Sequence, residues 1–411
     1  MNKITVFQYF DEFESFVWKK SEIEKVLNET KFKNTDDRVF YINGLEYSWK
    51  NLSRHDFSQL NFELEIGINI ILFYSLNGSL VEMNLNSFFD KVKKEDKNKK
   101  VYFVIIKCVE NFWGWYETPK KNLEEKLKSL SQIENLKIIS EYPEVNLNNF
   151  YFSPKLAVQT FYNNPIFKYG SLFFLGNELF KRFPKSYRIG FHIGNLGDYV
   201  RNYLAEQFFD YDNKNIWITV ADTIFNKKTI DNKKLINCVN FNSKYWNDTN
   251  KFGDYMSDEW YLEQFIEMTI KSDIEIVYET HTPLFESDWA IKFTEKTLKL
   301  LYLGKPFIHT DPVAFNLLKK CGLKPCYSLY SNELINIYEN YKMSKSKDEN
   351  EKYLPSLKNN IEWLANMDSD EWDSRLIEAN KITKYNYDRV RQLIFETSLI
   401  DMIKDIENGI Q

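Results

Sequence analysis

The chain has 411 residues, of which 43% are hydrophobic and 27% are charged, and its net charge is −5. This composition is sufficient for two or three folded domains, and it excludes a small disulfide-rich module and a mostly disordered chain. The acidic balance argues against a globally basic nucleic-acid-binding surface, whereas a local basic groove is still compatible with it.

Neither a membrane span nor a secretory signal is expected. No apolar run approaches the roughly 18 to 20 residues that a membrane-spanning helix needs, and acidic residues appear by position 11. The four cysteines, Cys108, Cys238, Cys321 and Cys326, show no CxxC spacing, which favours reduced buried thiols in a cytoplasmic protein. The abundance of Asn, Lys, Ile, Phe and Tyr is typical of AT-rich coding, as in a low-GC bacterium or a phage, where the compartment would be the host cytoplasm.

The first half of the chain predicts an α/β domain. In chain order, we expect strands over 37–42, 68–76, 80–85, 101–106 and 136–140, and a helix over 122–130. Asn77-Gly78 between the second and third of these strands predicts a hairpin. The charged stretch 91–100 is typical of a solvated helix end or loop. The aromatic segment 165–183 predicts a helix, and Pro184 marks a domain boundary.

The second half alternates strands and helices more regularly. We expect strands over 187–193, 216–220, 274–278 and 306–309, and helices over 198–208, 259–271, 295–303 and 313–321. This alternation predicts a parallel sheet in a Rossmann-like domain. The charged segment 344–353 is expected to be mobile, and the rest of the chain to Gln411 is expected to form helices.

The carboxyl end of the strand 274–278 is the most informative place for chemistry. Glu279, Thr280 and His281 follow this strand directly, and ligands of open α/β sheets bind at such ends. Thr294 is expected to cap the next helix, and Gly304 is expected to end it. The sequence therefore places polar side chains and a helix N-terminus close together.

These residue types allow a nucleoside diphosphate site. Free N–H groups at a helix N-terminus bind phosphate, and Lys296 and Lys299 add positive charge. Glu295 can accept hydrogen bonds from two ribose hydroxyls. From the residues alone, an ordinary surface pair between Glu295 and Lys299 explains the same spacing.

A family resemblance favours the nucleotide site. The segments 294–299, 305–308 and 317–323 together resemble the C-terminal signature of fucosyltransferase-like GT-B glycosyltransferases, over about Ser272 to Leu323. The resemblance implies two Rossmann-like domains that face each other across a cleft, with C-terminal helices crossing back to the first. It implies that Glu295 binds the ribose of the donor nucleotide and that Lys296 faces its diphosphate.

The turn after the strand 187–193 gives a weaker match to the same family. Gly194 would let the backbone approach a ligand closely, and Arg201 matches an arginine that the family carries at the helix start. The preceding arginines of the family are absent here. Arg201 is therefore either a donor-binding residue or a surface helix residue. The spacing of the glycines is not that of a dinucleotide-binding fingerprint.

The acceptor is expected in the first domain. Trp113, Trp115 and Tyr116 follow the strand 101–106 and suit stacking on a sugar ring or a base, although a hydrophobic cluster under a loop is the alternative. A transferase that inverts the anomeric centre needs a carboxylate to take the acceptor proton. The candidates are Glu110 and Glu117, and beyond them Glu63, Glu65 and Asp56.

The resemblance therefore implies a metal-independent glycosyltransferase without a cofactor, in which a nucleotide-diphosphate sugar is the donor substrate. The four histidines form no metal-binding pair, so no metal site is expected. The expected domains are 1–184 for the acceptor, 185–343 for the donor, and 344–411 for the helices that pack back. The expected acceptor is a glycan or lipid-linked saccharide. The alternatives are a phage enzyme acting on a hydroxymethylated DNA base and a non-catalytic nucleotide- or sugar-binding protein.

Overall fold

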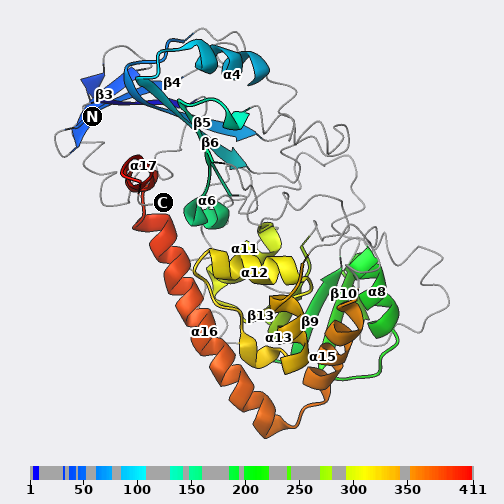
Figure 1. Ribbon diagram of the computed structural model, residues 1–411. Helices are drawn as coiled ribbons and strands as arrows, with labels where there is room; N and C mark the ends of the chain where they lie inside the picture. Colours follow the sequence, from blue (N-terminus) through cyan, green and yellow to red (C-terminus); the bar gives the residue numbers. More distant parts are fainter. Residues whose placement is uncertain are drawn as a thin grey trace, which may run out of the picture. The chain divides into compact units, whose positions relative to one another are not determined.

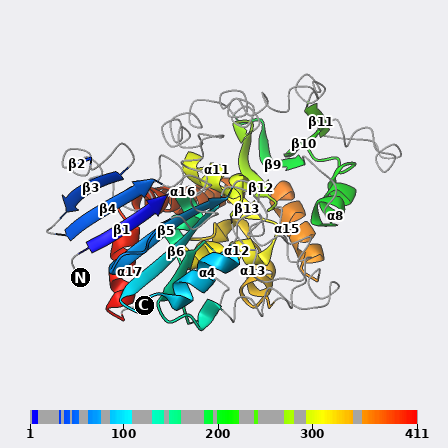
Figure 2. The same cartoon turned by 90° about the horizontal axis from the view of Figure 1, so that it is seen from above.

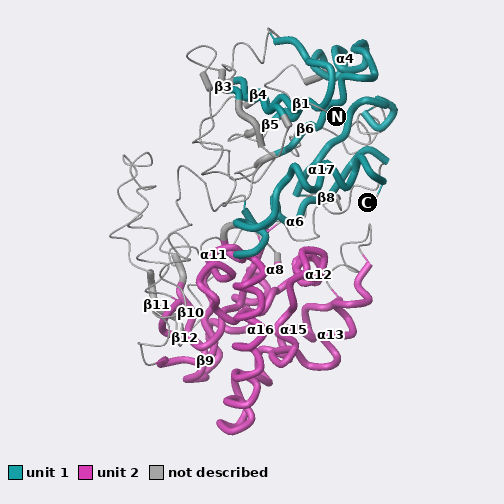
Figure 3. Tube along the Cα trace, turned by 90° about the vertical axis from the view of Figure 1, so that its left-hand side faces the viewer, with its two compact units in different colours: residues 1–163, 391–411 teal, residues 164–390 magenta. Residues whose placement is uncertain are grey.

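The chain forms two compact units, which are described separately. The computed structural model describes residues 3–8, 31–32, 37–42, 45–51, 62–75, 85–107, 130–141, 148–159, 185–193, 199–221, 238–241, 269–279, 293–342 and 352–409. Unit 1 consists of residues 1–163 and 391–411, and unit 2 of residues 164–390 (Figure 3). The boundary predicted at Pro184 lies outside the described residues.

Unit 1 contains an eight-stranded, mostly parallel sheet (Figure 2). Its strands, in spatial order, are β2 (Lys31–Phe32), β3 (Asp37–Ile42), β4 (Leu45–Asn51), β1 (Lys3–Gln8), β5 (Gly67–Ser75), β6 (Lys99–Lys107), β7 (Leu136–Ser140) and β8 (Phe150–Phe152). Among the described strands of this sheet, β3 runs antiparallel to both of its neighbours, β2 and β4, and the other pairings are parallel. The predicted strands 37–42, 101–106 and 136–140 are confirmed.

The hairpin turn predicted at Asn77-Gly78 lies outside the described residues. β5 has parallel neighbours on both sides, β1 and β6. It is buried on both faces of the sheet, because Ile70 and Ile71 are each nearly inaccessible although they point in opposite directions. An apolar run buried on both faces is typical of a central parallel strand.

Helices cover both faces of this sheet. On one face, α17 (Leu399–Glu407) packs through Leu399, Ile400 and Ile403 against a cluster that includes Ile70 and Val104. On the other face, the aromatic rings of α4 (Leu85–Lys94) pack against Phe103. The last helix of the chain thus completes the core of the unit that contains the first strands (Figure 1).

Polar contacts hold α17 in place at its C-terminal end. The carboxylate of Glu407 accepts hydrogen bonds from the Lys100 amine, from the Tyr102 hydroxyl and, at 2.7 Å, from the Lys137 amine. Burial by itself raises the pKa of Glu407, but these donors lower the pKa to about 2. The ionised carboxylate therefore ties the helix to strands β6 and β7.

The long helix α16 (Ser369–Phe395) begins in unit 2 and ends in unit 1. The buried amine of Lys155, on α6 (Pro154–Gln159), donates to the carbonyls of Ile394 at 3.1 Å and Thr397 at 2.7 Å. Carbonyls in the last turn of a helix have no partner within the helix, and a cation there also interacts favourably with the helix dipole. Lys155 therefore stabilises the end of α16.

Unit 2 contains a five-stranded parallel sheet. Its strands, in spatial order, are β11 (Cys238–Phe241), β10 (Ile216–Ala221), β9 (Tyr187–Ile193), β12 (Ser272–Val277) and β13 (Phe307–His309). All four pairings are parallel. The predicted strands 187–193, 216–220, 274–278 and 306–309 are confirmed to within two residues, and so is the expectation of an α/β fold with parallel sheets.

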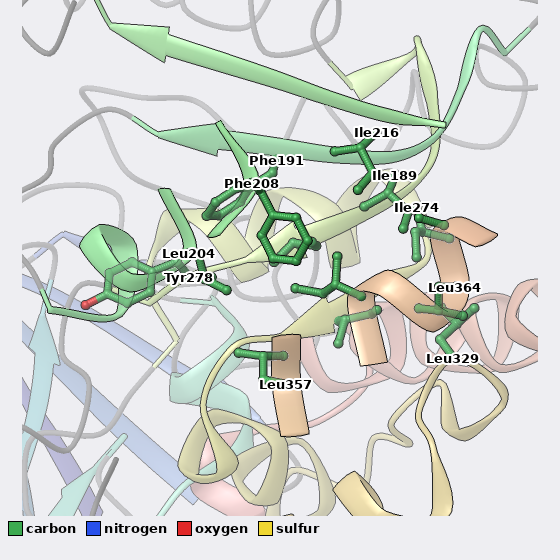
Figure 4. Packing of buried hydrophobic residues seen from close by; sticks show 14 of the residues in the cluster. Ile189, Phe191, Leu204, Phe208, Ile216, Ile274, Tyr278, Leu329, Leu357 and Leu364 are labelled. Carbon is green, nitrogen blue, oxygen red and sulfur yellow. The ribbon is translucent and has the colours of Figure 1, made fainter. Parts of the chain in front are cut away.

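The helices of unit 2 lie on both faces of its sheet. One face packs on α8 (Tyr199–Phe208), α12 (Pro312–Lys320), α13 (Asn332–Glu339), α15 (Leu354–Asn366) and the short 3-10 helix η3 (Tyr327–Leu329). Ile189, Ile216, Ile274, Leu204 and Leu357 meet in this core (Figure 4). The other face carries α11 (Glu295–Leu303), whose Thr297 contacts His309. The predicted helices 198–208, 295–303 and 313–321 are confirmed.

Candidate functional site

The strand order of unit 2 defines one special position at the carboxyl edge of its sheet. From β9 the chain proceeds outward to β10 and β11, then returns to β12 on the other side of β9 and continues to β13. Ligands of open α/β sheets bind where the strand order reverses in this way. We call the carboxyl ends of β9 and β12, at Ile193 and Val277, the switch point; Tyr278 and Glu279 follow the second of them.

Arg201 from the first turn of α8 reaches the switch point. Its guanidinium lies 4.3 Å from the ring centroid of Tyr278, a cation–π contact between the segments that follow β9 and β12. Arg201 is buried, with 9% relative exposure. Arg201 is therefore not an exposed surface residue, and its positive charge lies beside the N-terminus of α8.

The N-terminus of α11 lies at the same edge of the sheet and is built around Glu279. The Glu279 carboxylate accepts hydrogen bonds from the Thr294 backbone N–H at 3.1 Å, from the Thr294 hydroxyl and from the Thr297 hydroxyl. Thr294 is the N-cap, as predicted, because its hydroxyl oxygen accepts from the backbone N–H of Lys296. A buried carboxylate thus occupies the positive end of the helix dipole.

The predicted donor residues are only partly described. Thr294, Glu279 and Lys299 are buried, and Lys296 is half-buried on the first turn of α11. Glu295 begins α11, but nothing is described of its side chain. The predicted residues outside the described part of the chain are Thr280, His281, Gly194, Glu110, Glu117, Trp113, Trp115 and Tyr116.

A buried polar network crosses the α11 side of the same sheet. The Glu275 carboxylate accepts a hydrogen bond from the Ser272 hydroxyl and pairs with His192 Nε2 at 2.9 Å. His192 Nδ1 lies 2.6 Å from Thr219 Oγ1 on β10, and Lys305 Nζ lies 3.8 Å from Glu275. Burial by itself raises the pKa of Glu275, but His192, Lys305 and Ser272 hold this pKa below its usual range. An ionised carboxylate is therefore held inside the sheet.

Two further residues make this network possible. Lys305 is fully buried and its amine donates to the carbonyls of Ser272 and, at 2.6 Å, Thr269. Burial lowers the pKa of Lys305 to about 8, against the opposing effect of Glu275. Gly190 leaves the space for the carboxylate, because a Cβ there would lie 2.7 and 2.8 Å from the two Glu275 oxygens.

Sequence reasoning missed Glu275, Thr297 and His309 as members of polar networks. A carboxylate within the apolar strand Ile274-Glu275-Ile276 was a usable signal, because a buried charge requires a partner. The partners themselves come from β9, β10 and the turn before β13. No spacing in the sequence predicts these pairings.

The described residues contain neither a candidate metal site nor a candidate membrane span. No group of three or more His, Cys, Asp or Glu side chains there could hold a metal ion. Among the helices that the structure describes, none is both long enough and apolar enough to cross a membrane.

Comparison with known proteins gives structural likenesses only. No protein-family model and no curated protein matches the chain. At 10% sequence identity, 93% of the chain aligns with 63% of a chain in a structure of accessory secretory proteins 1, 2 and 3 of Streptococcus pneumoniae, with a TM-score of 0.37. The chain therefore spans less than two thirds of the length of that protein.

Two other structures align over nearly their whole length. T4 phage BGT in complex with UDP and Mn²⁺ has 10% identity and a TM-score of 0.34, with 95% of this chain and 97% of that chain covered. An E. coli structure described as trehalose-6-phosphate bound with UDP-2-fluoro glucose has 10% identity and a TM-score of 0.35, with 96% and 98% covered.

Proposed function

We propose that the protein is a glycosyltransferase that moves a sugar from a nucleoside-diphosphate donor to a hydroxyl group, without a metal ion. The observation that carries this proposal is the position of Arg201. Its buried guanidinium lies at the switch point of unit 2, against Tyr278 and beside the N-terminus of α8. A guanidinium binds phosphate oxygens through paired hydrogen bonds, and a helix N-terminus favours anions.

The two helix N-termini at this edge suit different parts of the donor. The Glu279 carboxylate already occupies the N-terminus of α11 and would repel a phosphate there. The diphosphate therefore belongs beside Arg201 and α8. The N-terminus of α11 suits the uncharged nucleoside, with Glu295 on the ribose hydroxyls as the family resemblance implies, and with Lys296 between the two parts.

This arrangement accounts for the chemistry of transfer. As the glycosidic bond to the phosphate breaks, negative charge develops on the departing nucleoside diphosphate. Fixed positive charge from Arg201 and Lys296 stabilises that charge in the transition state, which is the task that a metal ion performs in other enzymes. An acceptor hydroxyl attacks the anomeric carbon and gives its proton to a carboxylate, for which Glu110 and Glu117 are the candidates.

The acceptor that we propose is a glycan or lipid-linked saccharide held by unit 1, with Trp113, Trp115 and Tyr116 stacking on its sugar rings. We further propose that the reaction takes place in the cytoplasm. Cys321 and Cys326 support this location, because both are free and buried thiols.

A binding experiment tests the donor site. Thermal stability is measured with ADP, CDP, GDP, UDP and dTDP, and with the corresponding nucleotide sugars, for the wild type and the Arg201→Gln variant. A ligand at 100 times its dissociation constant adds about 2.7 kcal/mol of stability. We expect one base to stabilise the wild type, and Arg201→Gln to lose most of this effect. Lys381→Gln on the exposed face of α16 is the matched control and should bind as the wild type does.

Transfer is then tested with the donor so identified. Release of the nucleoside diphosphate is followed with glycan, lipid-linked and hydroxymethylated-DNA acceptors, in the presence and absence of EDTA. Activity that persists in EDTA supports metal independence, and activity only on DNA would favour the phage alternative. Donor binding without transfer or donor hydrolysis would indicate a non-catalytic binding protein. If no nucleotide stabilises a folded wild type, the glycosyltransferase proposal is wrong.

A further inference from the structure

A series of hydrogen bonds behind α11, which we call the relay, connects three elements of unit 2. It runs from His309 on β13 through Thr297 on α11 to Glu279 at the end of β12. His309 Nε2 lies 2.8 Å from Thr297 Oγ1, and the Thr297 hydroxyl donates to Glu279. All three side chains are at most 2% exposed, so this series of hydrogen bonds is shielded from water along its length.

The direction of these hydrogen bonds is fixed. Burial lowers the pKa of His309 to about 3, so its imidazole is neutral and carries a single N–H. Because the only proton of the Thr297 hydroxyl goes to Glu279, His309 must carry its proton on Nε2 and donate it to Thr297. Each member thus donates to the next, and the last acceptor is the carboxylate at the N-terminus of α11.

The ring of His309 is held firmly in this orientation. Phe293 stacks on it with an interplanar angle of 9°, and Phe307 meets it edge to face. On the backbone, the His309 N–H donates to the Tyr330 hydroxyl at 2.9 Å, and the Tyr338 hydroxyl donates to the His309 carbonyl at 3.3 Å. The two phenylalanine rings therefore restrain the imidazole, and the two tyrosine hydroxyls fix the backbone that carries it.

Fold stability alone does not account for a histidine at this position. His309 Nδ1 is buried and has no hydrogen-bond partner among the described residues, which costs free energy that an apolar ring would not. What an apolar ring cannot supply is the hydrogen bond to Thr297. The polarity of His309 thus serves the orientation of Thr297 and Glu279.

We propose that His309 and Thr297 are positioning residues for the nucleoside part of the donor. Acting through Glu279, they fix the first turn of α11, and with it the backbone positions of Glu295 and Lys296. This inference rests on the proposed function and assigns separate roles to two sets of residues. The relay from His309 to Glu279 determines the affinity for the nucleoside, whereas Arg201 determines how much the diphosphate adds to that affinity.

The test compares nucleosides with nucleoside diphosphates. Dissociation constants are measured by calorimetry for ADP, CDP, GDP, UDP, dTDP and the five parent nucleosides. Thr297→Val keeps the shape of the side chain but removes the hydroxyl, and His309→Phe keeps an aromatic ring. We expect both variants to weaken the nucleoside and its diphosphate by the same factor, about tenfold. Thr297→Ser restores the hydroxyl and should bind within about twofold of the wild type.

Arg201→Gln supplies the opposite pattern, because it should weaken the diphosphate and leave the nucleoside unchanged. Hydrogen exchange provides a readout without any ligand: amides of the first turn of α11 should exchange about tenfold faster in Thr297→Val, but not in Thr297→Ser. Unchanged exchange in Thr297→Val overturns the inference. So does nucleotide binding that Thr297→Val leaves intact, even though the proposed function would then stand. A wild type that binds no probe overturns the donor role together with the proposed function.

Discussion

Replacing Gly190 by alanine tests whether this glycine exists to make room for the buried Glu275 carboxylate. The new Cβ would lie 2.7 and 2.8 Å from the carboxylate oxygens and 2.8 Å from the Ser272 hydroxyl. These distances are well inside van der Waals contact, so the carboxylate must move. Its pairing with His192 at 2.9 Å and its hydrogen bond from Ser272 are the contacts at risk.

The expected cost follows from those contacts. Overpacking a core by one methyl group costs about 1 to 3 kcal/mol, and breaking a buried ion pair costs about 3 to 5 kcal/mol. Gly190→Ala displaces Glu275 without deleting it, and alanine in a strand regains roughly 0.5 to 1 kcal/mol relative to glycine. We therefore expect Gly190→Ala to lower the free energy of unfolding of unit 2 by about 2 to 3 kcal/mol.

A double-mutant cycle separates this clash from other effects. Urea unfolding is measured for the wild type, Gly190→Ala, Glu275→Ala and the double variant, and hydrogen exchange of β9 and β12 assigns the transition to unit 2. Without the carboxylate, the new Cβ still lies 2.8 Å from the Ser272 hydroxyl, but this side chain can rotate once its acceptor is gone. Gly190→Ala should therefore cost about 1 kcal/mol in this background, which gives a coupling energy of about 1 to 2 kcal/mol. An equal cost of Gly190→Ala in both backgrounds would refute the reasoning.

Three further predictions concern single side chains. Glu407→Gln should lower the free energy of unfolding by about 1 to 2 kcal/mol at pH 7, a value reduced for the partial exposure of its lysine partners. In urea titrations, the variant should lose less stability than the wild type between about pH 4.5 and pH 2, by this same amount; equal losses would contradict the role of Glu407. Between about pH 6.5 and pH 3, His309 is protonated in the unfolded state but not in the folded state. Between pH 7 and pH 5, the free energy of unfolding of the wild type should therefore fall by about 2 kcal/mol relative to that of His309→Phe. If stability depends on pH in the same way in both proteins, His309 is not buried in its neutral form. Lys155→Met removes the donor to the carbonyls of Ile394 and Thr397 and should lower the free energy of unfolding by about 1 to 3 kcal/mol, measured by thermal unfolding. The control variant Lys358→Met removes the more exposed ion pair with Glu362 and should lower it by less than about 1 kcal/mol.

The sequence by itself determined the elements whose signals are local. The strand 187–193 and the helix 295–303, with Thr294 as its N-cap and Gly304 at its end, agree with the structure because periodicity and capping depend on near neighbours in the chain. The alternation of such elements was enough to predict parallel α/β sheets. The sequence did not predict that β5 pairs in parallel with both β1 and β6, because these partners lie far from it along the chain.

Only the tertiary structure decided which polar side chains meet. Arg201 and Tyr278 are far apart in the chain, and they come into contact because the strand order reverses between β9 and β12. The relay from His309 to Glu279 likewise depends on the register that places β13 beside β12. Hydrogen bonds and ion pairs act over a few ångströms of space, whereas sequence patterns report neighbours along the chain, so the fold class was readable from the sequence and the partners in the candidate site were not.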